Sequence, residues 1–138
     1  MEIYNRKAKF NYFIMDEIEC GIELIGTEVK SLRAGKADFN DSYARIKDNE
    51  VFLTNMFISK YEEGSYLNHE ERRERKLLLH KAQISKLSKE ITLENKTLIP
   101  LKLYFTRGKA KILLGVCKGK KLYDKRQTIK QRDIERRG

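Results

Sequence analysis

The sequence contains few of the residues on which metal sites, disulfide frameworks and nucleophilic active sites depend. Its 138 residues include two cysteines, two histidines, one proline and no tryptophan. Cys20 and Cys117 lie far apart and form no Cys-x-x-Cys pair, so they indicate neither a disulfide framework nor a zinc site, and we expect buried, reduced thiols. No Gly-x-Ser-x-Gly frame and no glycine-rich phosphate loop is present. We therefore expect a protein that is not an enzyme and has no cofactor.

Long hydrophobic runs are also missing. No apolar run approaches the ~20 residues that cross a bilayer, and the charged N-terminus is not followed by the apolar stretch of a secretory signal. We therefore expect a cytoplasmic protein without membrane contacts. The length fits one domain with at most a tail, and we expect a monomer.

Charge of one sign is in excess. Lysine and arginine number 30 against 20 acidic residues, a net charge of +10, which favours a polyanionic partner. Residues 117–138 hold nine of the basic and three of the acidic residues and almost no apolar ones. Such a segment cannot offset its own ordering entropy. We predict a folded RNA-binding domain over residues 1–122 and a basic tail over 123–138 that is disordered when free.

Apolar and polar residues alternate in several short segments. This pattern predicts a strand over residues 12–24, with Gly21 at a bulge or bend. Residues 42–57 predict a hairpin around an Asp-Asn turn, and residues 98–116 predict a second hairpin, with Pro100 at a strand start.

Other segments predict helices or loops. Residues 27–35 begin with a capping-type threonine and end with glycine, which predicts a short helix. Residues 62–75 show no periodicity and predict a long exposed loop, followed by a brief apolar strand or helix entry at 77–79. Residues 80–91 place apolar side chains three and four apart and predict a helix.

These elements predict a mainly β fold. About six short antiparallel strands with two or three short helices avoid open edges by closing on themselves. Of the small closed barrels, the oligonucleotide-binding type fits the positive charge best. Seven tyrosines and six phenylalanines among the basic residues also fit nucleic-acid binding, although composition does not say which nucleic acid.

Six stretches carry a resemblance to one family. They are NRKA at residues 5–8, GTEVKSLRAG at 26–35, NHE at 68–70, RKLLLHK at 75–81, GKK at 119–121 and DKR at 124–126. In this order the chain resembles the SmpB family, the SsrA-binding proteins of bacterial trans-translation. The ten-residue block and the two C-terminal motifs are far more specific than a lone short pattern.

The resemblance implies a binding protein that catalyses no bond change. Members of this family bind tmRNA (SsrA RNA), protect its tRNA-like end and bring it to the vacant A site of ribosomes stalled on messages without a stop codon. The implied partners are tmRNA, the small-subunit decoding region and rRNA of the ribosome, and an elongation factor through the shared tmRNA. The implied oligonucleotide-binding barrel agrees with the strand pattern.

The resemblance also implies a barrel face that grips the elbow of the tRNA-like domain. By motif position Glu19, Leu78 and His80 belong to this face, with the carboxylate accepting hydrogen bonds, the leucine packing on a base and the histidine hydrogen-bonding to RNA. His80 is alternatively a helix-start residue, and Glu28 and Lys30 are alternatively helix surface. The cations expected to neutralise phosphates are Lys7, Lys9, Lys30, Arg33, Arg75, Lys76, Lys118, Lys120 and Lys121.

The tail has a second implied role. In the family it becomes helical on the ribosome and enters the decoding region and the empty mRNA channel. The residues expected to contact the ribosome are Asp124, Lys125, Arg126, Lys130, Arg132, Arg136 and Arg137. The chain ends earlier than most family members, so the tail is either short by nature or cut. In the second case we expect RNA binding without trans-translation.

Two other function classes share part of this pattern. A ribosomal or general RNA-chaperone barrel protein would have the same charge and fold, but no preference for a tRNA-like elbow over random single strands. A metal-dependent nuclease would use Asp16, Glu17, Glu19 and Glu23 and cleave RNA on addition of magnesium. We expect no metal site, because these carboxylates fit the solvated face of a strand.

Overall fold

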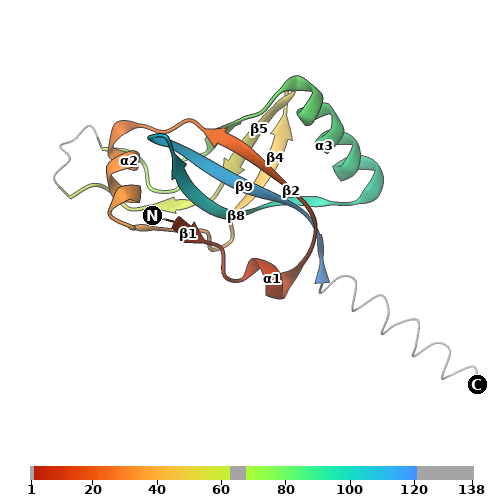
Figure 1. Ribbon diagram of the computed structural model, residues 1–138, viewed down its shortest axis with the longest axis horizontal. Helices are drawn as coiled ribbons and strands as arrows, with labels where there is room; N and C mark the ends of the chain where they lie inside the picture. The colour runs from red at the N-terminus through yellow and green to blue at the C-terminus, as the bar shows by residue number, and fades with distance from the viewer. Residues whose placement is uncertain (1, 63–67, 121–138) are drawn as a thin grey trace, which may run out of the picture.

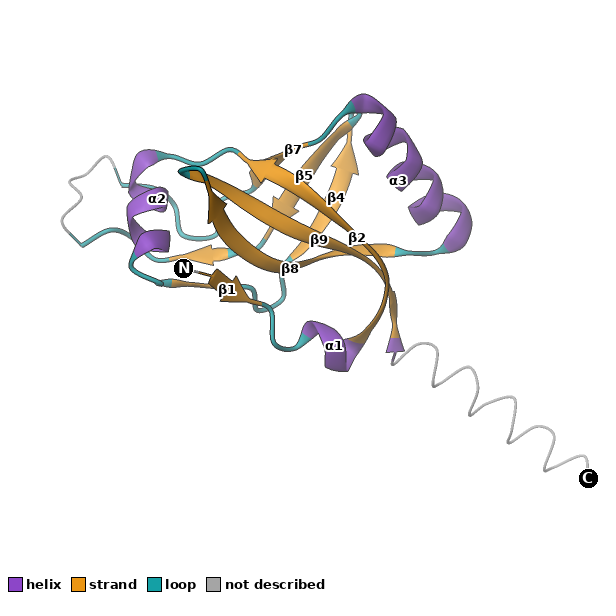
Figure 2. Ribbon diagram, viewed as in Figure 1, coloured by secondary structure: helices purple, strands orange, loops and turns teal. Residues whose placement is uncertain are grey.

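The computed structural model describes residues 2–62 and 68–120, which are rich in strands (Figures 1 and 2). The strands are β1 (Glu2–Tyr4), β2 (Tyr12–Ile22), β3 (Ala37–Asp38), β4 (Tyr43–Lys47), β5 (Glu50–Thr54), β6 (Phe57–Ile58), β7 (Arg75–Leu78), β8 (Thr97–Thr106) and β9 (Lys109–Gly119). The helices are α1 (Ala8–Asn11), α2 (Gly26–Arg33) and α3 (Lys81–Glu94). The predicted domain boundary at residue 122 and the tail lie outside the described residues.

Six of these strands close into a ring. Its order is β8, β4, β5, β7, β2 and β9, and β9 pairs with β8 to complete the circle. β1 is added beside β8, and β3 pairs with β6 in a separate two-stranded sheet. The predicted closed barrel of about six strands is confirmed. β1, β3 and β6 were not predicted, because strands this short show no alternation.

Both predicted hairpins are present, and each turns on two residues with positive φ. Asp48 and Asn49 have φ of 52° and 60° between β4 and β5, and Arg107 and Gly108 have φ of 53° and 79° between β8 and β9. Turns with two positive φ angles match the right-handed twist of the flanking strands. The local sequence therefore sets both connections.

Two local predictions about strands are wrong. Pro100 is not at a strand start but inside β8, where the pairing with β9 shifts register directly after it. Such an irregularity accommodates a residue that has no N–H to donate. Gly21 continues the regular ladder opposite Leu78, and the register shift in β2 instead follows Ile14.

One hydrophobic core fills the barrel, and α2 and α3 lie at its opposite ends (Figure 1). Leu32 of α2 and Ile84 and Leu87 of α3 are buried in this core, so the apolar faces of both helices point inward. Both predicted helices are confirmed. α1 packs separately, with Ala8 against Ile99 and Cys117. The core contains Leu53, Met56, Leu77, Leu98, Leu103, Ile112, Leu114 and Val116, among others.

Both cysteines are buried and free of disulfides, as the sequence predicts. Burial raises the pKa of the Cys20 thiol to about 12 and that of Cys117 to about 11. Both thiols therefore stay protonated at neutral pH and behave as small apolar side chains.

Candidate nucleic-acid interface

β2, β7 and the start of α3 form a shallow depression on the outside of the barrel. Its volume is about 300 Å³, and it is lined by Glu19, Cys20, Gly21, Leu78, Leu79, His80, Gln83 and Lys111. Strand pairing explains this assembly, because Gly21 of β2 lies directly opposite Leu78 of β7. The structure thus brings together Glu19, Leu78 and His80, the three residues predicted for the barrel face that grips the RNA elbow.

Leu78 presents an apolar surface in this depression. Its side chain is 47% exposed although it lies in a paired strand. A Cβ on Gly21 would lie only 3.3 Å from Cβ and Cδ1 of Leu78, so a side chain there would push against the leucine. Glycine at position 21 therefore keeps this surface open, and its exposed apolar group can pack against the flat face of a base.

Glu19 is an exposed carboxylate with a fixed neighbour. The hydroxyl of Tyr104 on β8 donates a hydrogen bond to Glu19 Oε2. Burial, this hydrogen bond and the negative charge of Glu19 raise the pKa of Tyr104 to about 12, so the hydroxyl keeps its proton and remains a donor at neutral pH. A carboxylate has about four acceptor sites, so Glu19 can accept further hydrogen bonds while it holds this one.

His80 precedes α3 as its N-cap. Its backbone N–H donates a hydrogen bond to Gln83 Oε1 at 2.9 Å, and its side chain is exposed. The helix-start role of this residue is therefore present. The helix-start role uses the backbone N–H of His80, whereas a contact with RNA would use its imidazole, so the two roles are compatible.

Two predicted cations on α2 lie over aromatic rings, and the ring below Arg33 lies beside the depression. Lys30 Nζ is 5.3 Å from the ring centroid of Tyr61, and the guanidinium of Arg33 is 4.9 Å from that of Phe105. Phe105 lines a second depression of about 380 Å³, which shares Leu78 with the first. Arg33 therefore adds positive charge beside the apolar surface.

The β8–β9 hairpin brings two further cations to this surface, which we did not predict. Lys111 lines both depressions and Lys109 lines the second. They alternate with Ala110 and with Ile112, which is fully buried. Alternation of lysine with small or apolar residues is the pattern of a strand with one solvent-facing side. That alternation is the signal from which both lysines could have been predicted.

Other predicted lysines lie at the opposite end of the β2–β9 pair. They are Lys7, Lys9, Lys118 and Lys120. Lys118 pairs with Phe13, six residues before Glu19 on β2, which is about 20 Å at 3.3 Å per residue. Lys120 Nζ donates to the carbonyl oxygen of Lys9 at 2.7 Å and lies 5.1 Å from the ring centroid of Phe13. Of the predicted cations, Arg33 therefore lies beside the depressions, and these four lysines form a separate group beside α1.

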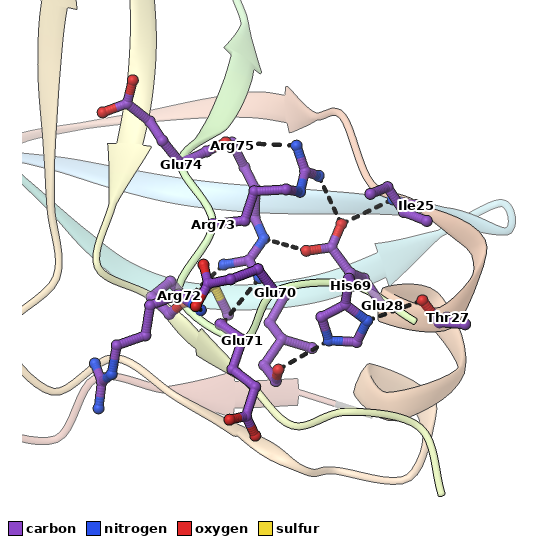
Figure 3. Close-up of polar contacts among 12 residues, drawn as sticks. Ile25, Thr27, Glu28, His69, Glu70, Glu71, Arg72, Arg73, Glu74 and Arg75 are labelled. Atoms are coloured by element: carbon purple, nitrogen blue, oxygen red, sulfur yellow. Dashed lines mark hydrogen bonds and ion pairs between the residues drawn. The ribbon is translucent and has the colours of Figure 1, made fainter. Parts of the chain in front are cut away.

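Arg75 does not lie on the surface, and Figure 3 shows the polar contacts around it. Its side chain is fully buried and forms an ion pair with the carboxylate of Glu28. Its guanidinium also donates to the carbonyl oxygens of Met56 at 2.6 Å and Glu71 at 3.1 Å. A buried guanidinium with three protein acceptors is not available to a phosphate. The prediction that Arg75 neutralises RNA phosphates is therefore wrong.

Glu28 is the buried partner of this arginine and ties α2 to the segment before β7. Glu28 Oε1 accepts hydrogen bonds from Arg73 at 2.7 Å and from the Ile25 N–H at 2.8 Å. Burial favours a raised pKa for Glu28, but the bonds from Arg73 and Ile25 and the charge of Arg75 outweigh burial and lower the pKa. Glu28 is therefore charged at neutral pH, and the alternative that it is helix surface is wrong.

His69 forms a second tie between α2 and the same segment (Figure 3). It is 3% exposed, and its Nε2 lies 2.9 Å from the carbonyl oxygen of Ile58, so Nε2 carries the proton and donates it. Its Nδ1 then accepts from the Thr27 hydroxyl at 2.8 Å. Thr27 thus binds His69 instead of capping the helix, whose N-cap is Ile25. The exposed loop predicted over residues 62–75 is wrong at His69 and Arg75.

The remaining predicted cations are either engaged or outside the described residues. Lys76 is half-buried, and its Nζ lies 3.1 Å from Glu50 Oε1 on the neighbouring strand. The predicted residues outside the described part of the chain are Lys121, Asp124, Lys125, Arg126, Lys130, Arg132, Arg136 and Arg137.

The carboxylates of the nuclease alternative are all exposed. They are Asp16, Glu17, Glu19 and Glu23. Over residues 2–62 and 68–120, no group of three or more histidine, cysteine or acidic side chains is arranged to hold a metal ion. In the same ranges, no helix has the length and apolar character needed to span a membrane.

Comparisons with known proteins agree with the resemblance. Residues 2–138 match the family described as SmpB protein. The SsrA-binding protein of Acetivibrio thermocellus is 56% identical over 132 residues, covering 96% of this chain and 86% of the relative. The SsrA-binding protein of Clostridium tetani is 55% identical over 136 residues, covering 96% of this chain and 87% of the relative.

A solved structure extends the similarity to the fold. A chain described under "tmRNA-SmpB: a journey to the center of the bacterial ribosome" superimposes with a TM-score of 0.72 at 52% identity. The match covers 86% of this chain and 84% of that chain. Since the family match spans nearly the whole sequence and the barrel agrees with that of a solved relative, this chain belongs to the SmpB family.

Proposed function

We propose that this chain binds the tRNA-like domain of tmRNA and delivers it to stalled ribosomes for trans-translation. The observation that carries the proposal is the depression shared by Glu19, Leu78 and His80, with Arg33 and Lys111 beside it. Relatives at more than 50% identity are named SsrA-binding proteins, and the solved relative is described together with tmRNA and the bacterial ribosome.

The groups around the depression suit a folded RNA elbow. Such an elbow offers splayed bases, 2′-hydroxyls and crowded phosphates. Glu19 accepts hydrogen bonds from base or ribose donors, Leu78 packs on a base, and the imidazole of His80 hydrogen-bonds to RNA. The lysines of the β8–β9 hairpin and the cations of α2 neutralise phosphates. Each role is one of binding, so the chain acts without catalysing a bond change.

The lysine group beside α1 gives RNA phosphates a second place to bind. This group contains Lys7, Lys9, Lys118 and Lys120, and it lies where the described part of β9 ends (Figure 1). The basic segment that follows carries the residues for the ribosomal decoding region and the empty mRNA channel. We also infer that the chain acts in the cytoplasm as a monomer and meets an elongation factor through the shared tmRNA.

Affinity for the tRNA-like domain of tmRNA is expected to fall steeply with salt. With about six phosphates neutralised, the slope of log affinity against log salt concentration should be about −4 to −5. Fluorescence anisotropy with a labelled tRNA-like domain at several KCl concentrations measures this slope. A nearly flat dependence would contradict the proposed phosphate contacts.

Random single-stranded RNA of equal length is the control in the same titration. It should also bind in a salt-dependent way, but more weakly, because it lacks the folded elbow. Equal affinity for both RNAs would favour the alternative, a ribosomal or general RNA-chaperone barrel.

A further inference from the structure

The hydroxyl of Tyr104 reaches Glu19 across a whole strand. Tyr104 on β8 pairs with Lys111 on β9, and Glu19 on β2 pairs with Leu113 on the same β9. The hydrogen bond between them therefore crosses β9 diagonally on the outside of the barrel. Neighbouring strands lie about 4.8 Å apart, and the offset of two residues adds about 6.6 Å along the strand, so the two side chains together span about 12 Å between their backbones. A long aromatic donor and a long carboxylate acceptor are needed to close that distance.

The ring of Tyr104 is held on its other side. Lys102 Nζ lies 5.1 Å from the ring centroid of Tyr104 and 5.9 Å from that of Tyr4. The same ammonium group is 3.9 Å from Glu2 Oε1, so β1 supports Lys102. Cation–ring contacts of this kind favour one ring orientation. The orientation they favour directs the phenolic hydroxyl to Glu19.

We propose that Tyr104 is a positioning residue for Glu19, which fixes the carboxylate for RNA without touching the RNA itself. This inference rests on the proposed tmRNA-binding function. An exposed glutamate samples several rotamers, and ordering it on binding lowers affinity. Tyr104 orders Glu19 before RNA arrives and occupies Oε2 only, which leaves acceptor sites for base or ribose donors.

Replacing Tyr104 with phenylalanine tests the proposal. Y104F keeps the ring and its contact with Lys102 and removes only the hydroxyl. Affinity for the tRNA-like domain should fall about tenfold, in the range of one hydrogen bond to a charged group. The salt slope should stay unchanged because no phosphate contact is lost. The melting temperature should stay close to that of the wild type, because the bond lies on the surface.

A double-mutant cycle separates positioning from direct RNA contact. If Tyr104 acts through Glu19, Y104F should weaken binding about tenfold in the wild type and hardly at all in a Glu19→Ala background. An equal loss in both backgrounds would mean that Tyr104 touches RNA itself, which overturns the proposal. No loss in the wild-type background overturns it as well.

Tyr4→Phe is the matched control. Tyr4 also donates its hydroxyl to a carboxylate, that of Glu2, and its ring also contacts Lys102. Y4F should leave affinity unchanged, and a loss equal to that of Y104F would overturn the specific role of Tyr104.

The wild type is tested in parallel on an RNA with a mutated elbow. If the wild type prefers the native elbow but Y104F has no effect, only the positioning role is refuted. If the wild type binds the native and the mutated elbow equally, the proposed function is refuted as well.

Discussion

Replacing Glu28 with alanine is expected to destabilise the folded chain by about 3–5 kcal/mol, the usual cost of breaking a buried ion pair. The variant leaves the guanidinium of Arg75 fully buried without its carboxylate. It also removes the acceptor for Arg73 and for the Ile25 N–H, so all three partners of this carboxylate lose their contact. Urea denaturation followed by circular dichroism measures the free energy of unfolding.

Two further variants make this test interpretable. Glu62→Ala removes a carboxylate that also pairs with a cation, Lys36, but at the surface, with Glu62 83% exposed. It should cost less than about 1 kcal/mol. Glu28→Gln keeps the shape of the side chain and one acceptor oxygen, so it should lose less stability than Glu28→Ala. If Glu28→Ala fails to fold, Glu28→Gln should still fold and allow the measurement. Unfolding free energies of Glu28→Ala and Glu62→Ala that agree within error would contradict the structural role of the pair.

The same pair predicts a dependence on acid. Because the folded state lowers the pKa of Glu28, its stabilising contribution is complete above the ordinary glutamate pKa, about 4.3. The contribution is lost as the pH falls through the lower folded value. The stability advantage of the wild type over Glu28→Gln should therefore be constant near neutrality and shrink below about pH 4.3.

Deleting the residues after Lys125 is expected to abolish peptide tagging on stalled ribosomes while leaving tmRNA affinity nearly unchanged. The deletion removes five cations and two carboxylates but none of the groups around the depression. The proposed role of this segment is on the ribosome, so its loss should spare the contacts between the barrel and tmRNA. A gel shift with tmRNA beside a tagging assay on stalled ribosomes gives both quantities.

A charge-matched variant shows whether the lost tagging reflects position or charge. Lys47, Lys86 and Lys89 are exposed on β4 and α3, and replacing all three with glutamine lowers the net charge by the same amount as the deletion. This triple variant should retain tagging. Equal loss of RNA affinity and tagging in the deletion would contradict separate roles for barrel and tail.

The sequence allowed the barrel to be predicted because its signals are local. Turn residues such as Asp48 and Asn49 set a hairpin with their own φ angles, and alternation over β2 shows which side faces the core. Closure of six strands then follows from the need to avoid open edges. The bulge after Ile14 has no such local signal, and the prediction of a bulge or bend at Gly21 is wrong.

Burial of charged residues could not be predicted in the same way. Arg75 lies in a polar segment whose pattern indicates exposure, and its partner Glu28 is 47 residues away in the chain. Only the folded structure brings the two together, and the pair makes burial tolerable. Likewise, Glu19 and Leu78 are far apart in sequence. The prediction that they share one face therefore rests on the family resemblance and not on their spacing. Tyr104 was missed because its role depends on a bond across β9.

The most direct test of the central claim is a binding cycle between the depression and the RNA elbow. Dissociation constants are measured for the wild type and for the triple variant Glu19→Ala, Leu78→Ala, His80→Ala. Each protein is titrated with the native tRNA-like domain and with an elbow-mutated RNA. The wild type should prefer the native RNA by at least about tenfold, and the triple variant should bind both RNAs equally weakly. A triple variant that still discriminates as strongly as the wild type would contradict the account.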